Sequence, residues 1–448
     1  MIDAKRPGTA YLVFICLVAA LGAMVFGYDT AVISGTIPFI ISFFKLDDLI
    51  LGVVVSSTIV GCIPGAMLVG KPADKFGRKP VLFAVALLFL ISAIGSGCAN
   101  TVWSLAFFRF IGGIAVGAAS VVAPMYIAEV SPAQLRGRMV AITQINIVLG
   151  MLVAYVANYY LVGVGENNWR WMFLALGVPA LAFLGLLFLI PDSPRWLVLR
   201  QRTTEAWQVL RRINGEADAR EELKAIEGSL ATNSEAPYAE LFRPSYRHLL
   251  VLGLFVATFN QLTGINVVMY YAPLILQQTG VATDSALLQT ALIGLNILIF
   301  TMLAMATVDR VGRKPLLIVG SLGMIMFQFM LAAAFHWKGY WVLICILGFI
   351  ASFAFSQGTV IWVVLTEIYP NRIRAKAQSI ATLTHWVWAF IITLTFPQMM
   401  KSLGGATFAF FGAAMVLQLI FVIGWLRETR GKSLEELESA FTRHSVLE

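Results

Sequence analysis

Charged side chains are scarce in this sequence. Only 12% of its 448 residues are Asp, Glu, Lys or Arg, whereas 59% are hydrophobic. About a quarter of the residues of a soluble globular protein are charged, so this chain has too little polar surface to cover a soluble fold. The composition therefore excludes a soluble enzyme, a nucleic-acid-binding domain and a disordered chain, and it favours a polytopic membrane protein.

Other signals are absent as well. No ten-residue segments of alternating hydrophobicity occur, so the spans are predicted to be helices rather than strands. The first apolar run begins at Tyr11 and is too long for the core of a cleaved signal peptide. The four cysteines have neither metal-ligand nor redox spacing and are predicted to be packing residues: Cys16, Cys62, Cys98 and Cys345. We expect no metal site and no cofactor.

Twelve stretches have the length of about 20 apolar residues that a helix needs to cross a bilayer. The predicted spans are 11–37, 50–70, 80–99, 103–126, 139–162, 171–190, 248–276, 285–308, 315–335, 340–365, 377–398 and 405–426. The long polar stretch 191–247 carries Ala206, Leu210 and Ile213 at helical spacing, which predicts short amphipathic helices on the membrane face.

The distribution of basic residues predicts the orientation. If the N-terminus is cytoplasmic, every Lys and Arg lies on the cytoplasmic side apart from Lys45, Arg170, Lys338, Lys401 and the intramembrane Arg109. The opposite orientation would reverse this bias, so both termini are predicted to be cytoplasmic. The net charge of +8 thus reports topology and does not indicate nucleic acid.

The chain also repeats itself. Residues 74–80 recur as 309–315, and the loop residues Glu129, Pro132 and Arg136 recur as Glu367, Pro370 and Arg374. Two motifs at nearly one offset indicate duplication of a six-span unit. We therefore expect an all-α protein with six-helix bundles at 1–190 and 248–426, a cytoplasmic linker at 191–247 and a cytoplasmic tail at 427–448.

Asp29 and Arg109 are the two charges that lie inside spans. Such charges cost at least about 2.5–3.5 kcal/mol each on insertion scales. Arg109 is near enough to the outer boundary to snorkel, but the short side chain of Asp29 is not. Both residues fall in the outer half of antiparallel spans, which predicts a pair. A carboxylate that alternates between arginine and a proton is the simplest proton-coupling device.

Acidic and basic residues are interleaved in the repeated loops. Asp74 is expected to pair with Arg78, and Glu129 with Arg136 and Arg138, across helix ends. Topology signalling alone would need the basic residues without the acidic ones, so a cytoplasmic gate is favoured. The predicted gate residues are Asp74, Arg78, Glu129, Arg136, Asp192, Arg195, Asp309, Arg313, Glu367 and Arg374.

Amide side chains inside spans form a third group. One alone usually packs helices, but Asn260, Gln261 and Asn266 cluster on one segment. A sugar needs many hydrogen bonds and an aromatic platform, which mid-span Trp362 could supply, although a tryptophan can equally belong to an interfacial belt. The candidate substrate-binding residues are Gln144, Asn260, Gln261, Asn266, Tyr270, Trp362, His385 and Trp386.

The motifs resemble those of the sugar porter family of the major facilitator superfamily, from about residue 10 to 440, and within it the bacterial D-xylose–proton symporters. The matching segments are 26–35, 74–79, 191–196, 261–273, 309–315 and 428–437. The strings 191–196 and 428–437 together are specific to sugar porters. The resemblance implies the major facilitator fold and transport by alternating access.

The resemblance also implies residue roles. Gln144, Gln261, Asn266 and Trp362 match positions that bind sugar hydroxyls, and Asp29 with Arg109 matches the proton-coupling pair. Facilitators carry a neutral residue at the position of Asp29, which favours symport. The chain departs from the family pattern at Met151, Asn260, Asn296 (one position before the usual asparagine, whose place Ile297 takes), Thr359, His385 and Ala389.

The leading hypothesis is a proton-coupled symporter of a monosaccharide, pentose or hexose, in a bacterial inner membrane. A facilitative uniporter, or a carrier of a cyclic polyol such as inositol, stays open as the alternative. No nucleophile with a base, metal-ligand set or phosphate loop supports an enzyme. The expected partners are a small neutral sugar or polyol, protons and the lipid bilayer, without nucleic acid, and the protein is expected to function as a monomer.

Overall fold

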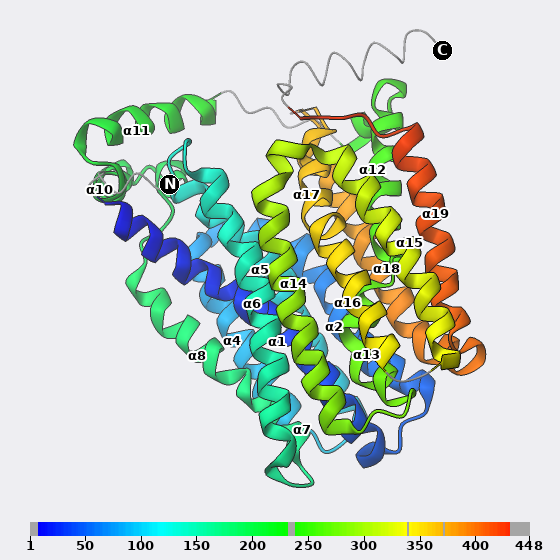
Figure 1. Cartoon of the computed structure of the whole chain (residues 1–448). Coiled ribbons are helices and arrows are strands. Elements are labelled where there is room, and N and C mark those ends of the chain that lie inside the picture. Colours follow the sequence, from blue (N-terminus) through cyan, green and yellow to red (C-terminus); the bar gives the residue numbers. More distant parts are fainter. Residues whose placement is uncertain (1–7, 232–237, 338–339, 371, 431–448) are drawn as a thin grey trace. The chain divides into compact units, whose positions relative to one another are not determined.

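The computed structural model describes residues 8–231, 238–337, 340–370 and 372–430. In this part of the chain, twelve helical segments are long and apolar enough to cross a membrane (Figure 1). They are Thr9–Phe44, Asp48–Leu68, Arg78–Gly97, Val102–Val130, Arg136–Val164, Asn168–Leu189, Tyr246–Gln277, Thr283–Val311, Arg313–Phe335, Trp341–Glu367, Arg374–Leu403 and Ala406–Gly424. Each predicted span overlaps one of them, so the chain is a multi-pass membrane protein.

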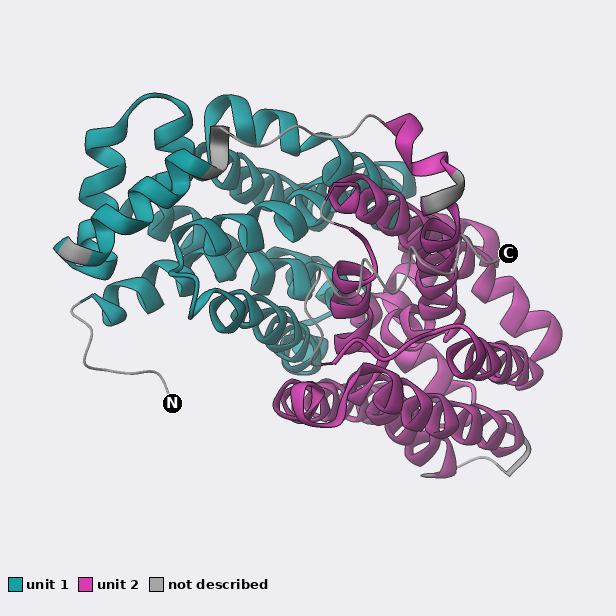
Figure 2. Cartoon of the chain, turned by 90° about the horizontal axis from the view of Figure 1, so that it is seen from above, with its two compact units in different colours: residues 1–33, 57–234 teal, residues 34–56, 235–448 magenta. Residues whose placement is uncertain are grey.

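The chain divides into two compact units (Figure 2). Unit 1 comprises residues 1–33 and 57–234, and unit 2 comprises residues 34–56 and 235–448. The boundary thus cuts the first two spanning helices. Parts of the predicted linker and tail, residues 232–237 and 431–448, lie outside the described residues, as does most of the motif 428–437.

Unit 1 is built around α4, which packs along α5 and against α7 and α8. The start of α5 is fixed locally, because the Thr101 side chain accepts a hydrogen bond from the Ser104 backbone N–H at 3.1 Å. Its helices are α1 (Thr9–Phe44), α2 (Asp48–Leu68), α3 (Gly70–Phe76), α4 (Arg78–Gly97), α5 (Val102–Val130), α6 (Arg136–Leu161), η1 (Val162–Val164), α7 (Asn168–Ala175), α8 (Gly177–Leu186), η2 (Leu187–Leu189), α9 (Pro194–Leu199), α10 (Thr203–Asn214) and α11 (Glu216–Ala231).

The polar stretch after the sixth span folds into the short helices α9, α10 and α11. The apolar face of α10 is buried through Ala206, Leu210 and Ile213, the positions expected from their spacing. Ala206 packs in a small core with Trp196 and Leu197 of α9. Burial of this face accounts for the helical pattern in an otherwise polar segment.

Unit 2 contains the remaining helices, the C-terminal part of α1 and the N-terminal part of α2. The start of α2 packs on α18, where Gly52 faces the Leu394 carbonyl too closely to admit a side chain and Asp48 pairs with Lys401 at 2.8 Å. Its own helices are η3 (Tyr238–Phe242), α12 (Pro244–Leu262), α13 (Ile265–Gln277), α14 (Thr283–Val311), α15 (Arg313–Trp337), α16 (Tyr340–Phe355), α17 (Gln357–Glu367), α18 (Arg374–Leu403) and α19 (Ala406–Gly424).

Two spans of unit 2 are discontinuous. The seventh span breaks between α12 and α13, where Gly264 adopts a left-handed φ of +75° that residues with a side chain rarely accept. The tenth span breaks between α16 and α17 at Ser356, whose φ and ψ are −123° and −90°. Such breaks free backbone and side-chain polar groups inside a membrane protein, and they commonly mark binding sites.

Candidate functional site: a buried ion pair, an amide cluster and two charge clusters

Asp29 on α1 and Arg109 on α5 form an ion pair inside unit 1. Arg109 Nη1 donates to Asp29 Oδ1 at 2.8 Å, and Nη2 donates to the Asp29 backbone carbonyl at 3.1 Å. Their side chains are 0% and 1% exposed. The Phe173 ring lies 5.5 Å from the guanidinium carbon and covers its face. The pair is therefore enclosed by protein.

One oxygen of this carboxylate is left over. Asp29 Oδ2 and Arg109 Nε are buried and have no hydrogen-bond partner among the described residues. A Cβ added to Gly112 would lie 3.3 Å from Asp29 Oδ1 and would clash with Ser92, so glycine keeps this space open. Breaking a buried pair by removing one charge costs about 3–5 kcal/mol. Neutralising Asp29 by protonation would therefore change the local energetics strongly.

The amides of unit 2 meet at the two helix breaks. Asn266 Nδ2 donates to Gln261 Oε1 at 2.8 Å, and Gln261 Nε2 donates to Asn260 Oδ1 at 3.2 Å. Gln261 Nε2 also lies 3.1 and 3.0 Å from the two ring nitrogens of His385 on α18. Asn260, Gln261, Asn266 and His385 thus form one hydrogen-bonded group, the amide cluster.

Tryptophan rings flank the amide cluster. The ring centroids of Trp362 and Trp386 lie 5.1 and 5.3 Å from that of His385. Trp362 is 39% exposed, so its ring remains available as a platform. Tyr270 is buried one turn after Asn266 on α13. Gln144 is partly exposed on α6, in unit 1.

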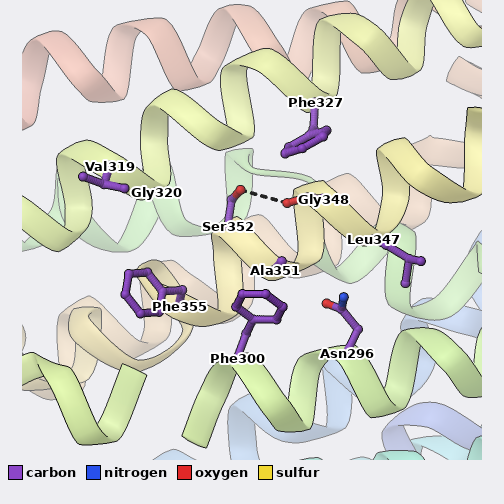
Figure 3. Close-up of a pocket in the computed structure, with 10 residues that line it drawn as sticks. All are labelled: Asn296, Phe300, Val319, Gly320, Phe327, Leu347, Gly348, Ala351, Ser352 and Phe355. Carbon is purple, nitrogen blue, oxygen red and sulfur yellow. Dashed lines mark hydrogen bonds between the residues drawn. The ribbon is translucent and has the colours of Figure 1, made fainter. Parts of the chain in front are cut away.

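Asn296 lies apart from the amide cluster. It lines an apolar pocket of about 440 Å³ between α14, α15 and α16, together with Phe300, Phe327 and Ala351 (Figure 3). Its Oδ1 is buried and accepts no hydrogen bond from the described residues. Because one residue turns a helix by about 100°, Asn296 and the neighbouring Ile297 face different sides of α14.

Charged residues at one end of unit 1 form the unit 1 charge cluster. Arg78 Nη2 lies 3.1 Å from Asp74 and 2.8 Å from Glu129, and Ser193 Oγ donates to the other Glu129 oxygen. Arg78 Nη1 also donates to the Ala73 carbonyl at 3.0 Å. Arg78 is 5% exposed, so these partners replace the water that its charge would otherwise need.

Unit 2 repeats this arrangement in the unit 2 charge cluster. Arg313 lies 3.1 Å from Asp309 and 2.9 Å from Glu367, and Thr429 Oγ1 donates to Glu367 at 2.5 Å. The backbone conformation is repeated as well, because Gly77 and Gly312, which precede the two arginines, have φ angles of +104° and +105°. The sequence repeat therefore extends to the side-chain contacts.

Glu428 has a separate role at the start of α15. It accepts backbone N–H bonds from Arg313 and Lys314 at 3.0 and 2.9 Å, and from Thr429 and Arg430 at 3.0 and 2.9 Å. Burial opposes ionisation of this carboxyl, but the four N–H groups outweigh it and hold the pKa of Glu428 below its usual value. Glu428 is therefore an anionic cap on the N-terminus of α15.

One predicted gate residue, Glu129, has another partner than expected. Glu129 pairs with Arg78 instead of Arg136, because Arg136 donates to the Ala128 carbonyl and lies 3.7 Å from Glu222 of α11. Arg374 donates to the Tyr369 carbonyl at 3.1 Å. The prediction that Glu129 pairs with Arg136 was wrong, since the separate helix α11 supplies the acid that Arg136 faces.

Asp192 and Arg195 flank Ser193 at the start of α9, and both are partly exposed. Burial raises the pKa of Asp192, although the positive charges of Lys79 and Arg202 oppose this rise.

Sequence reasoning missed the roles of Ser193, Thr429 and Glu428. The first two occupy equivalent places after the sixth and twelfth spans, a correspondence visible only once Glu129 and Glu367 were known to be their acceptors. Among the described residues, no group of His, Cys, Asp or Glu is arranged to hold a metal ion.

Comparison of the sequence and the structure with known proteins identifies the fold and the family of the chain. The inward-open structure of the xylose transporter XylE from E. coli superposes with a TM-score of 0.85 at 39% identity, covering 96% of this chain and all of the other. The protein therefore has the fold of the major facilitator transporters. The family described as sugar (and other) transporter matches residues 15–441, and the chain belongs to this family.

Two relatives illustrate the likeness within the family. The D-xylose-proton symporter of Escherichia coli strain K12 is 39% identical, with 96% of each chain covered. The arabinose-proton symporter of Bacillus subtilis strain 168 is 37% identical, with 98% of this chain and 97% of the relative covered. Members of this family are transporters and not enzymes.

Proposed function

We propose that this protein is a proton-coupled symporter that takes up a monosaccharide, a pentose or a hexose, by alternating access. The observation that carries the proposal is the buried pair of Asp29 and Arg109 with Asp29 Oδ2 left unpaired. The symporters named above, for xylose and arabinose, support both the proton and the class of sugar.

Asp29 is the proposed proton carrier. Arg109 holds Oδ1 and the backbone carbonyl of residue 29, which leaves Oδ2 as the atom that accepts the proton. Protonation removes the attraction for Arg109 and leaves a buried cation without its counter-ion. That state is costly, and it favours a conformational change that lets Arg109 find new partners.

The proposed sugar-binding residues of unit 2 are Asn260, Gln261, Asn266, Tyr270, Trp362, His385 and Trp386, and Gln144 of unit 1 is proposed to bind sugar as well. Their amides offer donors and acceptors in pairs, as sugar hydroxyls require, and the exposed Trp362 ring offers an apolar face. Gln144 is included because it matches a sugar-binding position of the family.

The two charge clusters are the proposed cytoplasmic gate. Pairing of Arg78 and Arg313 with acids from separate helices would hold the helix ends together in one state and release them in the other. Arg136, Asp192, Arg195 and Arg374 are assigned supporting places in the gate.

The proposal includes the organisation and setting of the chain. Six-helix bundles at 1–190 and 248–426 are joined by the linker 191–247 and followed by the tail 427–448. The protein acts as a monomer in the lipid bilayer of a bacterial inner membrane, with both termini in the cytoplasm, the orientation favoured by its basic loops.

A uniporter for sugars, or a carrier for a cyclic polyol such as inositol, is the alternative on the same fold. Uptake of a panel of pentoses, hexoses and inositol into vesicles holding the purified protein separates the two. We expect an imposed proton gradient to drive at least one monosaccharide above its external concentration. Equilibration without accumulation for every compound would establish uniport, and accumulation of inositol alone would change the substrate class.

A further inference from the structure

Gln357 connects the two broken spans of unit 2. It is the first residue of α17, directly after the break at Ser356, and its side chain is 2% exposed. Its Oε1 accepts a hydrogen bond at 3.3 Å from the Nδ2 of Asn260, which lies two residues before the end of α12. The amide cluster therefore continues into α17.

The hydrogen bonds of this series all run in the same direction. Asn266 donates to Gln261, Gln261 donates to Asn260, and Asn260 donates to Gln357, in each case from the amide nitrogen to the next amide oxygen. Such series polarise each member in turn, and reversing one amide would set two oxygens or two nitrogens against each other. The orientation of the Gln357 amide therefore determines the orientation of the Asn266 amide at the other end of the series.

A buried acceptor lies beyond Gln357. Gln418 on α19 is 2% exposed, and its Oε1 has no hydrogen-bond partner among the described residues. Gln357 and Gln418 line the same small cavity of about 10 Å³. That is about the room one water molecule needs, and the two amides supply the minimum of two polar partners.

We propose that Gln357, Gln418 and one buried water between them are the anchor that fixes the direction of the amide series. Gln357 Nε2 donates to the water, and the water donates to Gln418 Oε1. Both glutamines are positioning residues. With this direction fixed, Asn266 uses its Nδ2 for Gln261 and presents its Oδ1, an acceptor, to the substrate. The matching sugar hydroxyl must therefore act as a donor, a conclusion that rests on the proposed sugar site.

The His385 ring does not provide this direction. An imidazole can offer either an N–H or a lone pair at the same place, so it accommodates Gln261 in either orientation. The direction is instead set at the Gln357 end of the series. There, the buried Gln418 Oε1 lies in the same cavity and has no hydrogen-bond partner among the described residues. A buried acceptor left unpaired costs about 1–3 kcal/mol, which favours a donor at this end.

The test compares sugars that lack one hydroxyl with sugars that carry fluorine in its place, using calorimetric binding to the purified full chain. Fluorine cannot donate a hydrogen bond. At the hydroxyl bound by Asn266, the deoxy and fluoro sugars should therefore bind equally weakly to the wild type. In Gln357→Met and in Gln418→Met, which nearly preserve side-chain size, Asn266 is free to turn its Nδ2 to the substrate. The fluoro sugar should then bind about 2- to 10-fold more tightly than the deoxy sugar.

Gln289→Met on α14, outside the cluster, is the matched control and should keep the wild-type pattern. The anchor would be overturned if the two analogues bind equally to both anchor variants while Asn266→Ala loses sugar binding. In that case the proposed sugar site would still hold. Unchanged sugar binding in Asn266→Ala would overturn the proposed sugar site and, with it, the anchor.

Discussion

At the scale of single residues, the molecule concentrates its polar groups where two helices are broken and where two charges meet. Asn260, Gln261 and Gln357 are each 3% exposed or less, and they lie among apolar spans. Amides in such places contribute little to helix association, about 0.6 kcal/mol on average. Their gathering at one place therefore favours a binding role over a packing role.

Replacing Gln261 or Asn266 by alanine should weaken sugar binding. Each change removes one or two hydrogen bonds to a neutral ligand, worth about 0.5–1.5 kcal/mol each, so affinity should fall about 2- to 12-fold per bond. Calorimetry on folded, purified protein measures this directly. Wild-type affinity for every tested sugar in both variants would remove these residues from the site.

His385 is expected to influence which sugar is preferred. Its ring contacts Gln261 and lies between Trp362 and Trp386. Because glutamine offers a donor and an acceptor at the end of a flexible chain, His385→Gln should change the ranking of sugars in a competition assay. An identical ranking in the variant and the parent would assign His385 to packing.

At the scale of elements, helix ends are held by charges that the repeat places twice. Arg78 and Arg313 make equivalent contacts with Glu129 and Glu367, and hydroxyl groups from Ser193 and Thr429 complete them. The two copies differ at the residue before each hydroxyl. Glu428, before Thr429, caps α15 with backbone hydrogen bonds, whereas Asp192, before Ser193, has an Oδ1 without a partner among the described residues. Duplication has therefore preserved the ion pairs and not the cap.

The cap predicts a pH-dependent contribution to stability. Because the folded pKa of Glu428 is lowered, its contribution is present above the ordinary value of 4.5 and is lost as the pH falls through the folded pKa. Glu428→Gln should cost about 1 kcal/mol at neutral pH, since partial exposure screens the charge, and almost nothing in acid.

Apparent melting temperatures of both proteins between neutral and acidic pH measure this difference. Glu227→Gln, an exposed position on α11, is the control and should have no effect. A Glu428→Gln deficit that persists unchanged in acid would show that the carboxylate charge is not its cause.

At the scale of the whole molecule, the sequence predicts the fold well because its strongest patterns are long. Twelve apolar runs and two duplicated motifs determine span number and repeat, and neither depends on side-chain detail. The approach of Asp29 to Arg109 was likewise predictable, because a buried charge needs a partner.

What the sequence could not predict depends on rotations and on contacts between distant segments. The acid that faces Arg136 comes from α11, and the place of Asn296 in an apolar pocket follows from a one-residue shift on α14. Gln357 joins the amide cluster because the breaks at Gly264 and Ser356 bring α12 and α17 together. No local pattern specifies these contacts.

The central claim is that Asp29 couples proton movement to sugar movement, and sugar-driven proton flux into vesicles tests it most directly. Adding a transported sugar outside should acidify the lumen of vesicles that hold the wild-type protein. Asp29→Asn keeps the size of the side chain that contacts Arg109 but cannot take up and release a proton. This variant should lose both the proton flux and uphill accumulation, while it still exchanges labelled sugar between the two faces. Wild-type proton flux with full accumulation in Asp29→Asn would contradict the account.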